Sequence, residues 1–216
     1  MRVKDSLTLH ALNGMDYGSV PFIGTGKTFK TGTMFSIIEK CPDLYSRPKA
    51  FYNYPDVSIF PADYQAYAVD SLDDIIPGSI LIGEDANRIW PSRQTKDSTL
   101  QRFMGVISHK DILAMFTLQN TSNVDQCIFR DQRVVNIHKP TDLISLAYER
   151  DEFRPYCQLA SDLIPRYAEA SAVDWHYVSF VPVFSEILIM DPAPWYGYVH
   201  SHGLRDVRIL DKGVSA

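Results

Sequence analysis

The stretch from Ile76 to Ser108 constrains the fold more than any other part of the chain. An apolar run, Ile80–Ile82, follows Pro-Gly and ends at Gly83, and a second, shorter run ends at Pro91. A polar loop then leads to a third apolar run over residues 103–107. Ile, Leu, Val and aromatic residues favour strands, whereas Gly, Pro, Asn and Asp favour the turns between them. The pattern predicts short strands joined by turns.

Similar apolar runs recur further along the chain, at residues 112–119, 127–137, 175–190 and 207–210. Turn residues separate them, and the run over 127–137 is typical of a hairpin. Strands at spacings of roughly ten residues indicate a sandwich or a barrel. We therefore predict a mainly β fold, a sandwich or barrel-like antiparallel β domain with long loops.

Helices should be few, at most one or two short ones. Glycines punctuate residues 1–40, and prolines interrupt the aromatic region between Tyr45 and Tyr67. The best helical candidate follows Thr141, a residue type that can cap a helix. We expect residues 1–45 to form an extended N-terminal arm with a first strand, and residues 46–216 a β-rich body with a possible seam near 120–140.

Composition narrows the functional classes. The net charge of −5 and the absence of a long Lys/Arg block argue against a nucleic-acid partner. No signal-peptide pattern opens the chain, and no apolar run approaches the ~20 residues that cross a bilayer, so no membrane partner is expected. Cys41, Cys127 and Cys157 are widely spaced, which predicts reduced thiols. These features indicate synthesis in a cytoplasm.

One segment invites comparison with a phosphate-binding loop. Gly24-Thr25-Gly26-Lys27-Thr28 contains the Gly-Lys-Thr that ends the motif G-x-x-x-x-G-K-[ST]. Aligned on Lys27, the motif requires a first glycine at the position of Pro21, and the match fails. On this alignment we predict a glycine turn and no nucleotide cofactor.

Two aromatic clusters are candidate interaction surfaces. The first contains Phe51, Tyr52 and Tyr54, and the second contains Trp195, Tyr196 and Tyr198. Aromatic residues of this kind pack in cores, form subunit interfaces or stack on sugars. Packing and contact roles both stay open for them.

Candidate chemistry is sparse elsewhere. His200 and His202 have the i, i+2 spacing of a metal pair on a strand, but exposed histidines in a loop explain them equally well. No other pattern supplies a nucleophile or a metal cluster. We expect neither a catalytic site nor a metal site.

The order of features from Gly78 through Pro91 to Phe103-Met104-Gly105-Val106-Ile107 resembles the small decoration, or cement, proteins of tailed-bacteriophage capsids. The segment Asp206–Leu210 resembles their last strand. The resemblance implies a non-enzymatic structural protein, often a homotrimer, that binds the major capsid protein at the capsid surface and stabilises the shell. The alternatives are a carbohydrate- or receptor-binding β module, a metal-dependent β-barrel enzyme that uses His200 and His202, and another head or tail component of the virion.

Overall fold

The computed structural model describes residues 5–54, 56–92, 98–130 and 133–197. Within these residues eight strands form one sheet in the spatial order β3-β2-β4-β5-β1-β6-β7-β8. From β3 to β6 every neighbouring pair is parallel, and β7 and β8 extend one edge in antiparallel fashion. The strands are β1 (Gly18–Ile23), β2 (Lys49–Tyr52), β3 (Ala66–Val69), β4 (Ile80–Gly83), β5 (Leu113–Leu118), β6 (Ile137–His138), β7 (Val178–Val181) and β8 (Glu186–Ile189).

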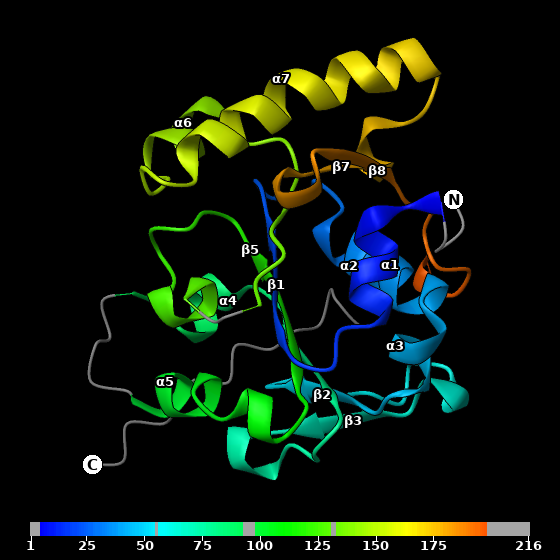
Figure 1. Cartoon of the computed structure of the whole chain (residues 1–216), viewed down its shortest axis with the longest axis vertical. Helices are drawn as coiled ribbons and strands as arrows, with labels where there is room; N and C mark the ends of the chain where they lie inside the picture. Colours follow the sequence, from blue (N-terminus) through cyan, green and yellow to red (C-terminus); the bar gives the residue numbers. More distant parts are fainter. Residues whose placement is uncertain (1–4, 55, 93–97, 131–132, 198–216) are drawn as a thin grey trace.

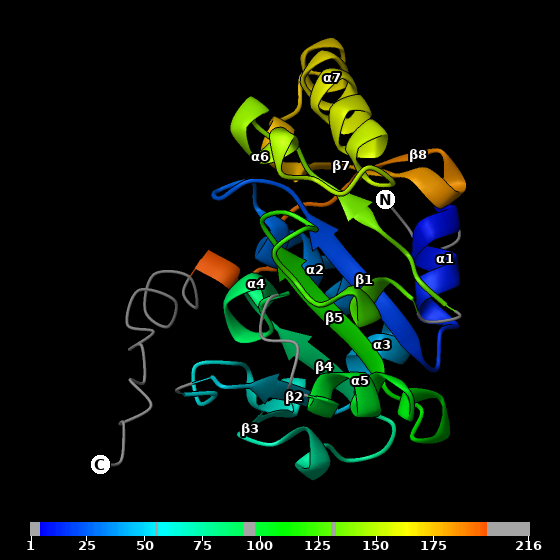
Figure 2. The same cartoon turned by 90° about the vertical axis from the view of Figure 1, so that its left-hand side faces the viewer.

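Helices cover both faces of this sheet. Figures 1 and 2 show α1, α2 and α3 on one face and α4 and α5 on the other, while α6 and α7 lie at the end that carries β7 and β8. The α-helices are α1 (Leu7–Asn13), α2 (Lys30–Lys40), α3 (Pro42–Ser46), α4 (Ala86–Ile89), α5 (Ser98–Met104), α6 (Leu143–Ala147) and α7 (Arg154–Ser171). Short 3₁₀ helices are η2 (Ala62–Tyr64), η3 (Leu72–Asp74), η4 (Ile107–His109), η5 (Gln126–Phe129), η6 (Trp175–Tyr177) and η7 (Pro182–Phe184).

The central strand β5 shows why the chain forms a layered α/β fold. All six of its residues are buried, and the five apolar ones are divided between two cores on opposite faces. Met115 packs with the residues of α1, α2 and α3, whereas Phe116 packs with those of α4 and α5. A parallel strand that is covered on both faces reads as one continuous apolar run. The predicted strand over 112–119 is confirmed as β5, but its uniform apolarity reflects helices on both sides.

The edge of the sheet beyond β6 has its own small core. Ala160, Ile164 and Ala168 of α7 are spaced at four residues and pack against Val178 and Phe180 of β7. The helix continues through Pro165, which lies on its exposed side. A proline at this position removes one backbone hydrogen bond, and burial of the opposite stripe maintains the helix.

The predicted antiparallel sandwich or barrel is therefore wrong. The expected strand over 103–107 lies in the end of α5 and the start of η4, and the expected hairpin over 127–137 is η5 followed by β6, which pairs in parallel with β1. Residues 7–40, expected to be mostly extended, form α1, β1 and α2. The short helix expected after Thr141 is confirmed as α6, although Asp142 caps it by accepting a hydrogen bond from Ser145 N at 2.8 Å. The domain boundaries stay predictions.

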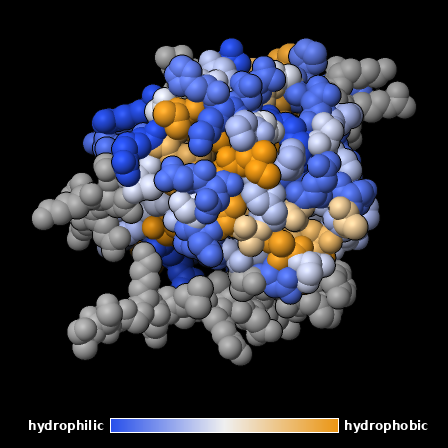
Figure 3. Space-filling model, turned by 90° about the horizontal axis from the view of Figure 1, so that it is seen from below, coloured by the Kyte–Doolittle hydropathy of each residue, from blue (hydrophilic) through white to orange (hydrophobic). Residues whose placement is uncertain are grey.

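The face seen from below in Figure 3 carries only small apolar patches, separated by polar side chains. Among the described residues, ten large apolar side chains are clearly exposed, and six of them lie on α6, on α7 or between these helices. Within the described ranges, no helix has the length and apolarity needed to span a membrane.

Candidate functional site

The loops that follow β1, β4 and β5 meet at one edge of the sheet. These three strands are adjacent and parallel, so their carboxyl ends lie together. In open α/β sheets, ligands bind outside the carboxyl ends of the strands. This edge is therefore the first place to look for a site.

The loop between β1 and α2, residues 24–29, turns sharply at this edge. Gly24 has φ +154° and lies against Lys139, so close that a Cβ at Gly24 would be 2.6 Å from the Lys139 Cβ. Lys27 and Phe29 both adopt left-handed conformations, at φ 63° and 64°. The loop thus reverses the chain tightly before α2 begins at Lys30.

Lys30 is buried, and its ammonium group folds back over the loop. Its Nζ donates to the carbonyl oxygens of Gly24 at 2.7 Å and Thr25 at 2.6 Å. Burial lowers the pKa of Lys30 to about 8, and the negative charge of Asp85 acts in the opposite direction. The result is a cationic group fixed at the centre of the turn, next to the amino end of an eleven-residue helix.

This geometry gives a different alignment with the phosphate-binding motif. Gly24 and Lys30 have the spacing of the first glycine and the lysine in G-x-x-x-x-G-K-[ST], and Thr31 occupies the last position. Only the second glycine differs, since Phe29 occupies its place. The comparison aligned on Lys27 was three residues out of register, so the motif was missed. The structural signal is the position of Lys30 at the start of the helix that follows β1.

Phe29 takes over part of the packing around the loop. Its ring makes edge-to-face contacts with Tyr177 and Tyr196, each with centroids 5.2 Å apart. The ring also covers Gly32, where an added Cβ would lie 2.2 Å from a ring atom. Phe29 and Gly32 therefore fit only as a pair, and the aromatic ring holds the loop against residues of the C-terminal half.

Two acidic residues follow β4 and face the loop. Burial raises the pKa of Glu84 to about 8, the charge of Asp85 adds to the rise, and a hydrogen bond with the Thr31 side chain opposes it. Glu84 Oε1 is buried and has no hydrogen-bond partner among the described residues. Asp85 adopts a left-handed conformation at φ 50°, and its N–H donates to Thr117 Oγ1 at 2.9 Å. The end of β5 thereby fixes the backbone of the second acid.

Lys139, after β6, borders the loop on its other side. It is fully buried, and its Nζ donates to the carbonyl oxygens of His176 at 2.7 Å and Val178 at 3.0 Å. Burial lowers the pKa of Lys139 to about 7, the nearby charge of Lys30 lowers it further, and Asp174 opposes both. Thr25 Oγ1 also donates to the Pro140 carbonyl at 3.0 Å. These contacts fasten the loop to the β6–β7 edge of the sheet.

The donor set fits a magnesium ion held together with phosphate oxygens. A magnesium ion in such sites takes one or two protein oxygens, phosphate oxygens and water. The Thr31 hydroxyl and the Glu84 carboxylate supply such oxygens side by side, and Glu84 Oε1 lacks another partner within the described chain. No group of three or more His, Cys, Asp or Glu side chains suited to a metal occurs in those residues.

The predicted contact residues lie mostly inside the protein. Phe51, Tyr54, Trp195 and Tyr196 pack in or against the core on the α2 side of the sheet, around Phe35. Tyr52 stacks on Trp90 on the opposite side, with centroids 5.0 Å apart. Tyr198, His200, His202 and the expected strand over 207–210 lie outside the described residues. An interaction role for the aromatic residues stays a prediction.

The fold is a mostly parallel α/β sheet, and the loop after its first strand carries a partial match to the phosphate-binding motif. No protein-family model and no curated protein matches the chain. Solved structures do match. The genome packaging NTPase B204 of Sulfolobus turreted icosahedral virus 2, in complex with ATP-gammaS, is 14% identical, covers 82% of this chain and 98% of its own, and gives a TM-score of 0.53.

Two further matches agree with the first. The same NTPase in complex with AMPPCP is 12% identical over 82% of this chain and 99% of its own, with a TM-score of 0.52. B204, the DNA-packaging ATPase of Sulfolobus turreted icosahedral virus, is 13% identical over 83% of this chain and all of its own, with a TM-score of 0.50. At these identities the similarity establishes the fold.

These findings overturn the resemblance to capsid decoration proteins and what it implied. The matched folds are those of NTPases solved with ATP analogues, so the prediction of a non-enzymatic, trimeric capsid stabiliser is wrong. The predicted partners are overturned as well: we expected binding to the major capsid protein and none to nucleic acid, whereas one matched protein is a DNA-packaging ATPase.

Proposed function

We propose that this chain binds and hydrolyses a nucleoside triphosphate and works as a virus-associated NTPase in genome packaging. The observation that carries the proposal is the position of Lys30, with its Nζ on the Gly24 and Thr25 carbonyls. A lysine held there meets the β- and γ-phosphates of a nucleotide cradled by the loop. The fold similarity to B204 supports the packaging role, which the local site does not address.

Each residue of the edge has a distinct task in this proposal. The backbone N–H groups of residues 25–30 and the amino end of α2 bind phosphate oxygens. Lys30 neutralises the charge that develops between the β- and γ-phosphates. Thr31 and Glu84 would hold the magnesium ion, which supplies further charge neutralisation when bound with the nucleotide.

Asp85 is the candidate for orienting the attacking water. Its charge acts on Lys30, and its backbone is fixed by Thr117. The water oxygen forms a bond to the γ-phosphorus while the bond to the bridging oxygen breaks. The water proton passes to the Asp85 carboxylate, and the products are the diphosphate and inorganic phosphate. Glu84 is not assigned this role, because in this proposal its carboxylate would hold the magnesium ion.

Two lysines in one loop provide a sharp test. Lys27 is exposed on the same turn, whereas Lys30 is buried within it. We expect Lys30→Ala to lower phosphate release from ATP by at least about 100-fold, because it removes phosphate charge stabilisation worth roughly 3 kcal/mol or more. Lys27→Ala should change the rate less than about threefold.

Phosphate release and the binding of a fluorescent ATP analogue would both be measured, with and without EDTA. Equal losses in the two variants would reject the Lys30 alignment. If the unmodified protein neither binds nor hydrolyses any nucleoside triphosphate, the proposed function is wrong.

A further inference from the structure

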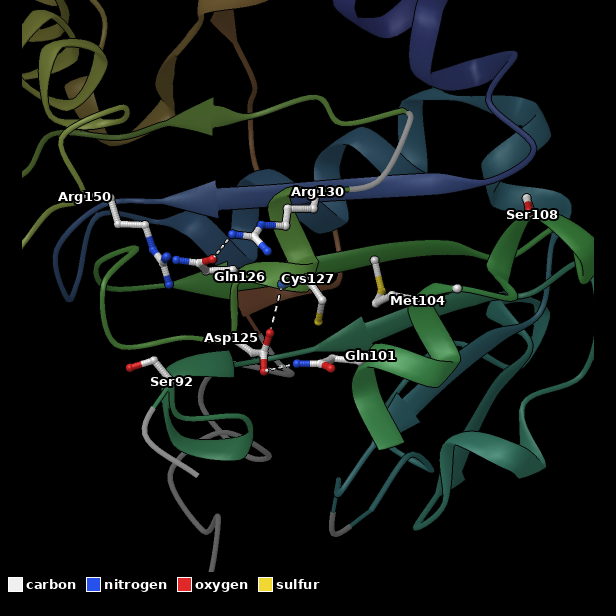
Figure 4. A pocket seen from close by; sticks show the side chains of 10 residues that line it. Ser92, Gln101, Met104, Ser108, Asp125, Gln126, Cys127, Arg130 and Arg150 are labelled. Carbon is white, nitrogen blue, oxygen red and sulfur yellow. Dashed lines mark hydrogen bonds between the residues drawn. The ribbon is translucent and has the colours of Figure 1, made fainter. Parts of the chain in front are cut away.

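A cavity of about 740 Å³ lies away from the phosphate-binding loop, between α5 and η5. Figure 4 shows side chains from α5, from η5 and from the segment before α7 pointing into it. The volume is in the range of sites that hold a small organic ligand. None of Gly24, Lys30, Glu84 or Asp85 lines it, so it is a separate site.

Two guanidinium groups border this cavity. Arg150 Nε donates to the Thr121 carbonyl and Nη2 to the Val124 carbonyl, each at 2.8 Å. Arg130 is exposed, and its Nη2 donates to Gln126 Oε1. These bonds use Arg130 Nη2 and the Nε and Nη2 of Arg150. Backbone and side-chain contacts thus orient both groups and leave part of each available.

The two arginines are near enough to repel each other. Burial lowers the pKa of Arg150, and the charge of Arg130 lowers it further, while Glu152, Asp125 and Glu149 oppose this. Asp125 lines the cavity, but its two oxygens are engaged. Oδ1 accepts from Cys127 N at 2.9 Å, and Oδ2 accepts from Gln101 Nε2 at 3.4 Å. The two guanidinium groups at the cavity favour an anionic ligand there, and the Asp125 carboxylate opposes it.

The rest of the lining suits a ligand with an anionic end and a less polar body. Ser92 and Ser108 add hydroxyl groups at the periphery. Met104, which is 6% exposed, and Cys127 present sulfur atoms on the wall between α5 and η5. Thioether sulfur makes favourable contacts with aromatic rings, including heteroaromatic ones.

We propose that this cavity is a second anion site, which takes a phosphate-bearing ligand of nucleotide size through Arg130 and Arg150. The phosphate can belong to a free nucleotide or to the end of a nucleic-acid strand, because both present the same oxygens and an attached base. The site does not depend on the Lys30 loop, so its test is independent of the proposed hydrolysis.

Cys127 provides a direct readout. It lines the cavity and is partly exposed, whereas Cys41 and Cys157 are fully buried and should react slowly. The rate of maleimide labelling of Cys127 would be followed in the full chain carrying Lys30→Ala, with circular dichroism to check folding. The probes are ADP and a 5′-phosphorylated oligothymidylate of about ten nucleotides. Protection by ADP indicates a free nucleotide, and protection by the oligonucleotide alone indicates a strand end.

Matched arginine variants then test the assignment. Arg130→Gln should weaken the binding of the protecting probe roughly tenfold, because one charge-assisted hydrogen bond is lost. Arg102→Gln, at an exposed arginine of α5 that does not line the cavity, should change it less than about twofold. Absence of protection by either probe at millimolar concentration would overturn the proposal. So would equal losses in the two variants, which would indicate attraction by general charge.

Discussion

Replacing Glu84 with Gln should stabilise the folded protein at neutral pH. Burial raises the pKa of this carboxyl from 4.5 to about 8, so the folded chain retains a proton that the unfolded chain has already released. Stability therefore falls as pH rises between these two values, at about 1.4 kcal/mol per pH unit. From pH 5 to pH 7 the loss amounts to roughly 2–3 kcal/mol from this one group.

Gln carries no such proton, and its carboxamide oxygen can still accept the hydrogen bond of Thr31. The Glu84→Gln chain should therefore lose much less stability between pH 5 and pH 8, while its ATP hydrolysis should fall at least about 100-fold.

Urea unfolding at pH 5, 6, 7 and 8 measures the change in stability for both chains. Glu169→Gln, which alters an exposed glutamate of α7, is the matched control and should leave the pH dependence unchanged. If the Glu84→Gln chain showed the same decline with pH as the parent, the carboxyl would have to be ionised in the folded state, and the argument from its burial would be refuted.

Two further substitutions probe the setting of the loop. Gly24→Ala should destabilise the fold by at least about 2 kcal/mol and abolish nucleotide binding, because φ +154° and the 2.6 Å approach to Lys139 Cβ leave no room for a methyl group. Thermal unfolding measures the loss of stability, and titration with a fluorescent nucleotide measures binding. Normal nucleotide binding by this variant would contradict the prediction. Lys139→Met should flatten the dependence of stability on pH above pH 7. The pKa of Lys139 is about 7 in the folded chain and 10.5 for an ordinary lysine, so the parent becomes more stable as pH rises between these values. Urea titrations at pH 7 and 8 give the clearest comparison, because Lys30 adds its own rise in stability above about pH 8. The same change in stability between pH 7 and 8 in both chains would contradict the lowered pKa of Lys139.

Some of the structure could be predicted from sequence because it depends on local chemistry. The apolar run over 112–119 forms β5, the chain around 175–190 forms β7 and β8, and the polar start at Thr141-Asp142 begins α6. Each of these follows from residue type and turn chemistry within about ten positions. The register of the phosphate-binding motif was also present in the sequence, but it became visible only when the helix start at Lys30 was known.

Residue types and turn chemistry fix where the apolar segments lie, where turns interrupt them, and which residues carry the chemistry of the loop from Gly24 to Thr31. The three-dimensional fold is needed to cover β5 with helices on both faces and to bring Glu84 and Asp85, more than fifty residues away in the chain, to face Lys30. The physical reason is that a buried apolar run has the same pattern in a sandwich and in a parallel sheet, so periodicity cannot distinguish them. Long-range strand pairing alone brings the carboxyl ends of β1, β4 and β5 together and so creates the site.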